Sequence, residues 1–232
     1  MKPYYDDGEG HVIYCGDCRD ILPSLPKMDL VLTDPPYNAK NIGPNKRVYE
    51  GSVMQLPDIE YKAFCLEWFS LLREGNIIFT PGISNVCNYP QPYWILCWHK
   101  PAAKSFNRFG GFNAWEPIFI YGKPFKRLPQ DYLLFNTLNL TKGPEREHPC
   151  SKPLSLWLYL LSLTEGQQVL DPFMGSGTTL RAAKDLGRKA IGIEIEERYC
   201  EIAAKRLAQS VMTFIPTPER NASEQMKLEA GI

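Results

Sequence analysis

The apolar run from Asp29 to Thr33 ends in Asp34-Pro35-Pro36-Tyr37, an acid followed by two prolines and an aromatic ring. A run of this length and composition is typical of a buried parallel strand. Asp34 is then expected at the carboxyl edge of an α/β sheet, where such sheets bind ligands. Because proline has a fixed φ and holds the residue before it extended, Asp34 and the Pro35 carbonyl are expected to be rigid and adjacent.

This tetrapeptide offers two hydrogen-bond acceptors beside a flat ring. The Asp34 carboxylate and the Pro35 carbonyl oxygen can together accept both hydrogens of an exocyclic amine. Tyr37 presents a face on which a planar ring can stack. The pattern indicates a receptor for the amino group of a nucleobase; the alternative, for the tetrapeptide taken alone, is a strand followed by a plain proline turn.

A glycine-containing turn links a second predicted strand to a helix. Val169 to Asp171 form the strand, Phe173 to Gly177 the turn, and Thr178 to about Leu186 the helix. The next strand, Lys189 to Ile195, carries Glu194 roughly 20 residues after the turn, where Rossmann-like folds have the acid that binds ribose hydroxyls. The unit therefore predicts a site for a cofactor that contains adenosine.

The composition of the turn narrows the class of cofactor. Leu180 stands where a dinucleotide fingerprint has its third glycine, and the Gly-Lys-Ser/Thr of a phosphate-binding loop is missing. Both observations disfavour a pyrophosphate cofactor or ATP. An adenosine without phosphates fits better, and S-adenosylmethionine is the candidate.

The remaining segments predict further strands and helices in an α/β order. The predicted strands are Val12–Cys15, Asn76–Thr80, Tyr93–Trp98 and Pro117–Tyr121, and the predicted helices are about Arg19–Leu25, Ile59–Leu72, Leu154–Leu163 and Glu197–Ala208. Residues 1–10 are expected to be loose. The glycine strand is expected beside the Asp34 strand, at the switch point of a doubly wound sheet.

Together the two motifs resemble those of the amino-group DNA methyltransferases, the N4-cytosine/N6-adenine family. Because Asp-Pro-Pro-Tyr precedes Phe-x-Gly-x-Gly, the resemblance is to their circularly permuted beta group; RNA and protein enzymes with Asn-Pro-Pro-Tyr usually have the glycine motif first. The resemblance covers the first forty residues and about 148–210. It implies a single domain over 1–210, a doubly wound, mostly parallel Rossmann-like sheet of the S-adenosylmethionine-dependent methyltransferase type, and a tail over 211–232.

The resemblance also implies roles for individual residues. Asp34, Pro35, Pro36 and Tyr37 are the expected catalytic positions. Asp17 matches an acid near the cofactor adenine, and Ser151 and Lys152 match a segment that touches the methionine end of the cofactor. The full set of expected cofactor positions is Asp17, Cys18, Asp34, Ser151, Lys152, Pro153, Asp171, Phe173, Gly175, Ser176, Gly177, Thr178 and Glu194.

The implied reaction is methyl transfer from S-adenosylmethionine to the N6 amino group of a flipped adenine in DNA, by direct in-line attack and without a metal. Cytosine-N4 enzymes of the family more often have serine at the position of Asp34, so adenine is preferred and N4-cytosine is the first alternative. RNA or a free nucleotide as substrate is a further alternative. A non-catalytic DNA-binding subunit is the last, and the intact Asp34, Tyr37, Gly175, Gly177 and Glu194 argue against it.

Charge gives a divided indication about DNA. With 26 basic and 26 acidic residues the net charge is zero, whereas duplex binding normally needs excess Lys and Arg. Basic and aromatic residues nevertheless alternate between Lys100 and Lys142, as on a nucleic-acid face or on a solvated loop above the core. Residues 99–147 are predicted as a small target-recognition insertion, and 38–57 as a mobile loop, either a lid or a connector. Expected DNA contacts are Lys40, Lys46, Arg47, Lys104, Arg108, Lys123, Lys126 and Arg127.

Seven scattered cysteines predict no disulfide framework. Cys15-x-x-Cys18 has no second pair at metal spacing, so we expect no metal site. Pro149-Cys150 lies in the segment matched to the cofactor, so a nucleophilic cysteine is not expected. The absence of a leader and of a long apolar run predicts a soluble cytoplasmic protein that acts on DNA, alone, as a homodimer, or with a second subunit for target recognition.

Overall fold

The computed structural model describes residues 2–38, 53–72, 75–101, 110–136 and 152–209. Within them one nine-stranded sheet forms the centre of the molecule. Its strands are β1 (Tyr5–Asp6), β2 (His11–Cys15), β3 (Leu30–Thr33), β6 (Asn76–Phe79), β7 (Trp94–His99), β8 (Trp115–Tyr121), β9 (Tyr132–Leu134), β10 (Gln168–Asp171) and β11 (Lys189–Glu194). Across the sheet they follow the order β1-β2-β11-β10-β3-β6-β8-β7-β9.

The middle of the sheet is parallel, as predicted. Strands β2, β11, β10, β3 and β6 run in one direction, whereas β8 is antiparallel to both β6 and β7. From β3 the chain continues to β6 on one side, and from β10 it continues to β11 on the other. The switch point therefore lies between β10 and β3, where Val169 is paired with Leu30, and the predicted adjacency of the two strands is confirmed.

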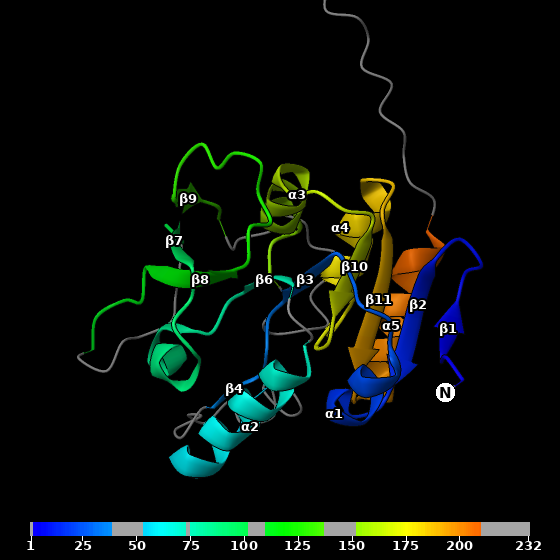
Figure 1. Ribbon diagram of the computed structural model, residues 1–232, viewed down its shortest axis with the longest axis horizontal. Helices are drawn as coiled ribbons and strands as arrows, with labels where there is room; N and C mark the ends of the chain where they lie inside the picture. The colour runs from blue at the N-terminus through cyan, green and yellow to red at the C-terminus, as the bar shows by residue number, and fades with distance from the viewer. Residues whose placement is uncertain (1, 39–52, 73–74, 102–109, 137–151, 210–232) are drawn as a thin grey trace, which may run out of the picture.

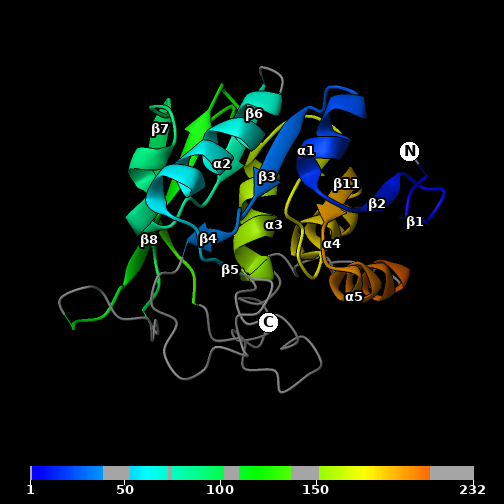
Figure 2. The ribbon, with the colours of Figure 1, turned by 90° about the horizontal axis from the view of Figure 1, so that it is seen from below.

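Helices cover both faces of the sheet (Figure 1, Figure 2). Helices α1 (Cys18–Ile21) and α2 (Asp58–Leu71) pack on one face, and α3 (Leu154–Leu163), α4 (Thr178–Asp185) and α5 (Glu197–Ala208) on the other. Successive strand side chains point to opposite faces, so Leu30 and Leu32 enter the core under α3–α5 while Val31 enters the core under α2. This two-sided burial explains why the Asp29–Thr33 run is apolar throughout.

Smaller elements complete the fold. Leu22–Ser24 and Ile83–Asn88 are 3₁₀ helices, and β4 (Tyr37–Asn38) pairs in parallel with β5 (Val53–Met54) in a separate two-stranded sheet. The Asn38 side-chain amide donates to the Leu56 carbonyl oxygen at 2.9 Å and its oxygen accepts from the Leu56 N–H at 3.0 Å. The two ends of the predicted 38–57 loop are thus joined beside Tyr37; residues 39–52 lie outside the described residues.

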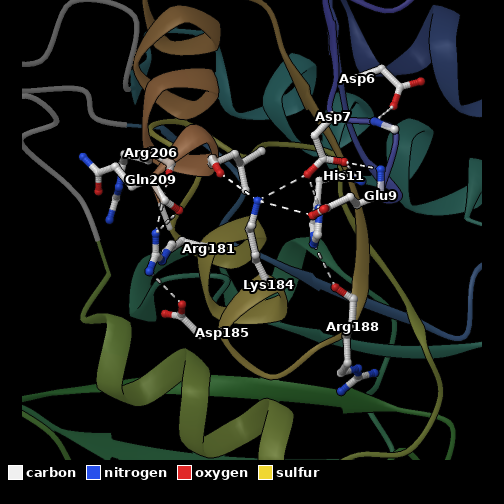
Figure 3. Close-up of polar contacts among 12 residues, drawn as sticks. Asp6, Asp7, Glu9, His11, Arg181, Lys184, Asp185, Arg188, Arg206 and Gln209 are labelled. Carbon is white, nitrogen blue, oxygen red and sulfur yellow. Dashed lines mark hydrogen bonds and ion pairs between the residues drawn. The ribbon is translucent and has the colours of Figure 1, made fainter. Parts of the chain in front are cut away.

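The expectation of a loose N-terminus is wrong for its described part. Strand β1 pairs with β2, and polar contacts hold the hairpin against α4 (Figure 3). The Asp7 carboxylate lies 2.7 Å from His11 Nδ1 and 3.4 Å from Lys184 Nζ, and His11 Nε2 lies 3.1 Å from the Arg188 carbonyl oxygen. The polar composition of residues 1–10 suggested a loose segment, but the charged side chains of the hairpin are paired with residues elsewhere in the fold.

The range 99–147 is not wholly an insertion. Strand β8 lies inside the main sheet between β6 and β7, and β9 extends the same sheet at its edge. Residues 102–109 and 137–147 of this range lie outside the described residues, as does the 211–232 tail. A role of this range in target recognition stays a prediction. In the described part of the chain, none of the helices has the length and apolarity needed to cross a bilayer.

Candidate active site

Four parallel strands end around one cavity of about 340 Å³. They are β2, β3, β10 and β11, whose carboxyl ends meet at one edge of the sheet because the strands are parallel and adjacent. Of the predicted site residues, this cavity is lined by Asp17, Cys18, Asp34, Pro35, Pro36, Tyr37, Lys152, Asp171, Phe173, Gly175, Ser176, Thr178 and Glu194. The location is the one at which doubly wound sheets bind ligands.

Three neighbouring side chains hold Asp34, which directly follows the carboxyl end of β3. Its Oδ1 accepts a hydrogen bond from the Tyr37 hydroxyl at 2.7 Å and another from the Thr80 hydroxyl, and its Oδ2 accepts from Lys152 Nζ at 2.7 Å. The Tyr61 hydroxyl donates to the Pro36 carbonyl at 3.0 Å, which fixes the backbone of the motif. The carboxylate is therefore oriented before any ligand binds.

Lys152 forms hydrogen bonds with Asp34 and Tyr37. The resemblance had instead implied that Lys152 binds the carboxylate of the cofactor. Its Nζ donates to the Tyr37 hydroxyl at 2.9 Å and lies 5.0 Å from the centroid of the Tyr37 ring. Burial raises the pKa of the Tyr37 hydroxyl, and the charge of Asp34 raises it further, so the hydroxyl remains a proton donor to Asp34. Ser151, the other predicted contact of this segment, lies outside the described residues.

A second carboxylate, Glu116 of β8, stands behind Lys152. Its Oε2 lies 3.6 Å from Lys152 Nζ, and its Oε1 accepts a hydrogen bond from Lys100 Nζ. Burial opposes ionisation of Glu116, but the charges of Lys152 and Lys100 outweigh this effect and lower its pKa. Asp34, Lys152, Glu116 and Lys100 thus form a row of alternating charges in which the two lysines are buried and the two acids are partly buried. Sequence reasoning missed this row because the sheet brings its members together.

Glu194 braces the glycine turn from the end of β11. Its Oε2 accepts from the Gly175 N–H at 3.0 Å and its Oε1 from the Glu196 N–H at 2.9 Å. Burial raises the pKa of the carboxyl, although these two N–H groups oppose the rise. Each carboxylate oxygen has a further lone pair, so Glu194 can also accept from ribose hydroxyls.

The turn itself fits an adenosine without phosphates. Arg206 donates to the Ser176 carbonyl oxygen at 3.0 Å and lies 3.2 Å from its hydroxyl, so part of the turn is engaged by the protein. Phe64 and Phe173 supply aromatic walls of the cavity. An apolar cleft with few polar groups is the usual form of a small-molecule site. Here the turn lacks a phosphate-binding loop, and the Glu194 carboxylate beside it is suited to ribose hydroxyls.

Asp171 is the most deeply buried acid of the cavity. It is 3% exposed, and its Oδ1 accepts from the Thr33 hydroxyl at 2.6 Å and from the Phe173 N–H at 3.0 Å. Burial raises the pKa of Asp171 to about 7. The residue therefore changes protonation near neutral pH at the floor of the site.

At the end of β2, Asp17 caps helix α1. Its carboxylate accepts from the Arg19 N–H at 2.9 Å and pairs with the Arg19 guanidinium at 2.6 Å, which lowers the pKa of Asp17. Burial raises the pKa of the neighbouring Cys18 thiol to about 12. A thiol that resists ionisation in this way is a poor metal ligand and a poor redox nucleophile.

Two predicted cofactor residues lie outside the cavity lining. Pro153 immediately precedes α3, and Gly177 has a φ of +80° and approaches α5 so closely that a Cβ would lie 2.7 Å from that of Ala203. Gly177 is thus required by backbone conformation and packing. Sequence reasoning also missed Thr80, which follows β6 at the same sheet edge and donates to Asp34, and several residues of the cavity lining, among them Phe64, which was predicted as core alone.

The predicted DNA contacts within the described residues, Lys123, Lys126 and Arg127, are not beside Asp34. They follow β8, which is antiparallel to β6, so they emerge at the amino edge of the parallel strands, where the Lys123 N–H donates to Asn76 Oδ1 at 2.9 Å. Lys126 forms an exposed ion pair with Glu165. Lys40, Lys46, Arg47, Lys104 and Arg108 lie outside the described residues.

Among the described residues, one group of metal-ligand type, Asp7, Glu9 and His11, has its ligand atoms within 4.8 Å of one another. Both ring nitrogens of His11 face protein acceptors, and Lys184 Nζ lies 3.4 Å from Asp7 and 3.9 Å from Glu9 (Figure 3). These contacts satisfy the group without an ion, and it lies at the β1–β2 hairpin.

Comparison with known proteins identifies the family. A family model described as DNA methylase, of the N6/N4 type, matches residues 91–205. The type II methyltransferase M.HpaI of Haemophilus parainfluenzae is 37% identical over 90% of this chain and 77% of its own length. M.HinfI of Haemophilus influenzae is 31% identical over 94% and 72%, and M2.DpnII of Streptococcus pneumoniae is 30% identical over 89% and 92%.

Solved structures agree with these sequence relatives. M1.HpyAVI, solved as a complex with S-adenosylmethionine, is 25% identical with a TM-score of 0.59 and covers 85% of this chain and 98% of that one. The cytosine-N4-specific PvuII DNA methyltransferase, at 19% identity, a TM-score of 0.65 and coverage of 95% and 90%, shares the fold. The chain therefore belongs to the N4/N6 DNA methylase family and is an S-adenosylmethionine-dependent DNA methyltransferase.

Proposed function

We propose that the enzyme methylates the N6 amino group of adenine in DNA and that Asp34 and the Pro35 carbonyl oxygen bind this amino group. One observation carries the proposal: the Asp34 carboxylate opens into the same cavity as Glu194 and the glycine turn. A base at Asp34 and a cofactor at Glu194 would share one enclosed space. Holding two reactants together in this way supplies a large part of the rate enhancement of a two-substrate reaction.

Asp34 acts on the amino nitrogen through its hydrogen bonds. That nitrogen is a poor nucleophile because its lone pair is delocalised into the base. Two acceptors on one side orient its hydrogens and stabilise the positive charge that develops on nitrogen. The Tyr37 and Thr80 hydroxyls hold the carboxylate in place for this task. Bound S-adenosylmethionine would supply the methyl group on its sulfonium sulfur; the sulfur would keep the C–S electron pair and leave as a neutral thioether, and the methylated nitrogen would release one proton to solvent.

On this proposal the cofactor is held by the chain's own acceptors. Glu194 accepts the ribose hydroxyls, and Phe64 and Phe173, whose rings pack against each other, form an aromatic wall for the adenine. Asp171, whose pKa burial raises to about 7, lines the same cavity, and only its ionised form would favour a cationic ligand. No metal-bound group takes part in this scheme.

The target base has to leave the DNA stack to reach the cavity. Flipping costs a few kcal/mol, and stacking on an aromatic side chain returns roughly 1–3 kcal/mol. Tyr37 is the proposed stacking residue. Its partly buried ring lines the cavity, and both Tyr37 and the residue after it pair with β5.

Adenine is proposed over cytosine because an aspartate stands at position 34, where N4-cytosine enzymes of the family more often have serine. The N4-cytosine alternative remains the second candidate, since the PvuII enzyme of the same fold is cytosine-N4-specific. We further propose a cytoplasmic protein that acts in restriction–modification, as the type II relatives suggest. A homodimer or a second subunit for target recognition belongs to the same proposal.

Product analysis tests this function. Purified enzyme is incubated with labelled S-adenosylmethionine and unmethylated DNA, and the digested nucleosides are analysed by mass spectrometry. The proposal expects N6-methyladenine. N4-methylcytosine would overturn the choice of base, and label in RNA but not in DNA would overturn the choice of nucleic acid.

A further inference from the structure

We propose that Lys152 is a displaceable counter-ion of Asp34, which leaves Asp34 for Glu116 when the amino group of the target base enters. Glu116 is then a positioning residue that acts through Lys152. This inference rests on the proposed binding of the base amine at Asp34. It does not depend on whether that base is adenine or cytosine.

Lys152 and a base amine compete for one oxygen of Asp34. Asp34 Oδ1 already accepts from the Tyr37 and Thr80 hydroxyls, so a base amine has to bind at Oδ2. Lys152 Nζ lies 2.7 Å from Oδ2, the distance of a charge-assisted hydrogen bond, and so occupies one of the two acceptor positions left on this oxygen. An ammonium at this point also repels the positive charge that develops on the amino nitrogen. Base binding and methyl transfer both favour a state in which Lys152 has moved away from Oδ2.

Glu116 offers Lys152 a second carboxylate oxygen close by. Glu116 Oε2 is buried and has no hydrogen-bond partner among the described residues, although it carries charge. Buried polar atoms without a partner are rare in folded proteins, and each calls for an explanation. Lys152 Nζ lies 3.6 Å from this oxygen, just beyond hydrogen-bond distance, so a small side-chain movement completes the bond.

Glu116 is itself held in place by its neighbours. Glu116 lies on β8 opposite Trp98 of β7, and Lys100 Nζ holds its other oxygen. The ammonium groups of Lys100 and Lys152 lie 5.4 Å and 5.9 Å from the Trp98 ring centroid. An aromatic face stabilises a cation within about 6 Å, so Lys152 can shift towards Glu116 without being left unpartnered.

The alternative is a static ion-pair row that only supports the fold. Buried salt bridges commonly have no role beyond structure, and removal of one member destabilises the protein. The two accounts differ in their effect on DNA kinetics. If Glu116 is the second position of Lys152, neutralising Glu116 traps Lys152 on Asp34 and reduces the fraction of enzyme that can accept a base.

The test is Glu116→Gln, assayed for kcat/KM with unmethylated DNA and for cofactor affinity by calorimetry. We expect kcat/KM for DNA to fall about tenfold or more, because a competent state that is ten times less populated weakens apparent binding by the same factor. Cofactor affinity should change less than about twofold. The matched control is Glu201→Gln, an exposed glutamate paired with Lys205 on α5, which should leave both quantities unchanged.

Two further variants keep the proposal open to refutation if Glu116→Gln does not fold. Glu116→Asp keeps the charge but shortens the reach, so it should fold and lose less of kcat/KM than the glutamine variant. Lys152→Met should retain cofactor affinity; a loss of about tenfold or more would place the cofactor carboxylate on Lys152 and overturn the inference.

The outcomes separate this inference from the proposed function. A wild-type enzyme that yields no N6-methyladenine refutes the choice of base, and the same kinetics can then be measured on the base that is methylated. An active wild-type enzyme with a Glu116→Gln variant of equal kcat/KM refutes the inference alone. Equal losses for DNA and for cofactor would assign Glu116 a structural role and refute it as well.

Discussion

Replacement of Asp171 by asparagine should remove a large pH dependence from the stability of this protein. Burial raises the pKa of Asp171 from 3.8 to about 7 in the folded state. An unfolded chain therefore releases this proton near pH 4, whereas the folded protein retains it until about pH 7. Between these values the folded state binds more protons, so the contribution of Asp171 to stability falls as pH rises.

The size of the effect follows from the same two values. Each unit of difference between the folded and unfolded pKa corresponds to about 1.4 kcal/mol. Over the whole window the wild-type protein should lose up to ~4 kcal/mol through this group. Asparagine keeps an oxygen that can accept from the Thr33 hydroxyl and the Phe173 N–H but does not titrate.

The assay is denaturant unfolding of both proteins at about pH 5, 6 and 7, with the difference in unfolding free energy as the readout. Groups common to both proteins cancel in this difference. The unfolding free energy of the variant should rise relative to that of the wild type by about 1.4 kcal/mol per pH unit. Asp20→Asn, an exposed aspartate on α1, controls for the loss of a carboxylate as such. A difference that does not change with pH would refute the assignment of a buried, neutral Asp171.

Three further predictions concern single side chains. Tyr37→Phe keeps the stacking ring but loses the hydroxyl bond to Asp34, so methyl transfer should slow about tenfold. Tyr37→Ala should slow methyl transfer further, because stacking of roughly 1–3 kcal/mol is also lost. Equal rates of the two variants would contradict the stacking role. Glu194→Gln should weaken cofactor binding about tenfold or more in calorimetry, and an unchanged affinity would exclude the ribose contact. At the hairpin, burial opposes ionisation, but backbone N–H groups and His11 lower the pKa of Asp7 to about 2. Asp7 should therefore contribute about 2 kcal/mol above about pH 4, lost as pH falls through about 2; acid unfolding of Asp7→Asn measures this, and a pH-independent difference would contradict it.

The sequence predicted elements whose signals are local. Helices α3 and α5 have the predicted bounds, since apolar spacing and the flanking residues specify where each begins and ends. The glycine strand was predicted to lie beside the Asp34 strand, and β10 pairs with β3; Asp34 and Glu194 line one cavity because parallel strands share a carboxyl edge.

Contacts that depend on topology were not predictable in this way. Nothing local indicates that Lys152 reaches Asp34, 118 positions away, or that Glu116 stands behind it. The antiparallel direction of β8 sends Lys123, predicted only as a DNA contact, to the edge of the sheet opposite Asp34. Strand β1 was missed because a polar segment of two paired residues carries almost no apolar signal.

The most direct test of the account is methyl transfer by Asp34→Ala in parallel with its cofactor affinity. Asp34 is proposed to act on the amino group and not on the cofactor. The account predicts that the rate of N6-methyladenine formation falls at least about a hundredfold, as for loss of one preorganised group that stabilises developing charge. Cofactor affinity, measured by calorimetry on the folded variant, should stay within about threefold of the wild type. A variant that methylates DNA at the wild-type rate, or that loses the cofactor and the activity together, would contradict the central claim.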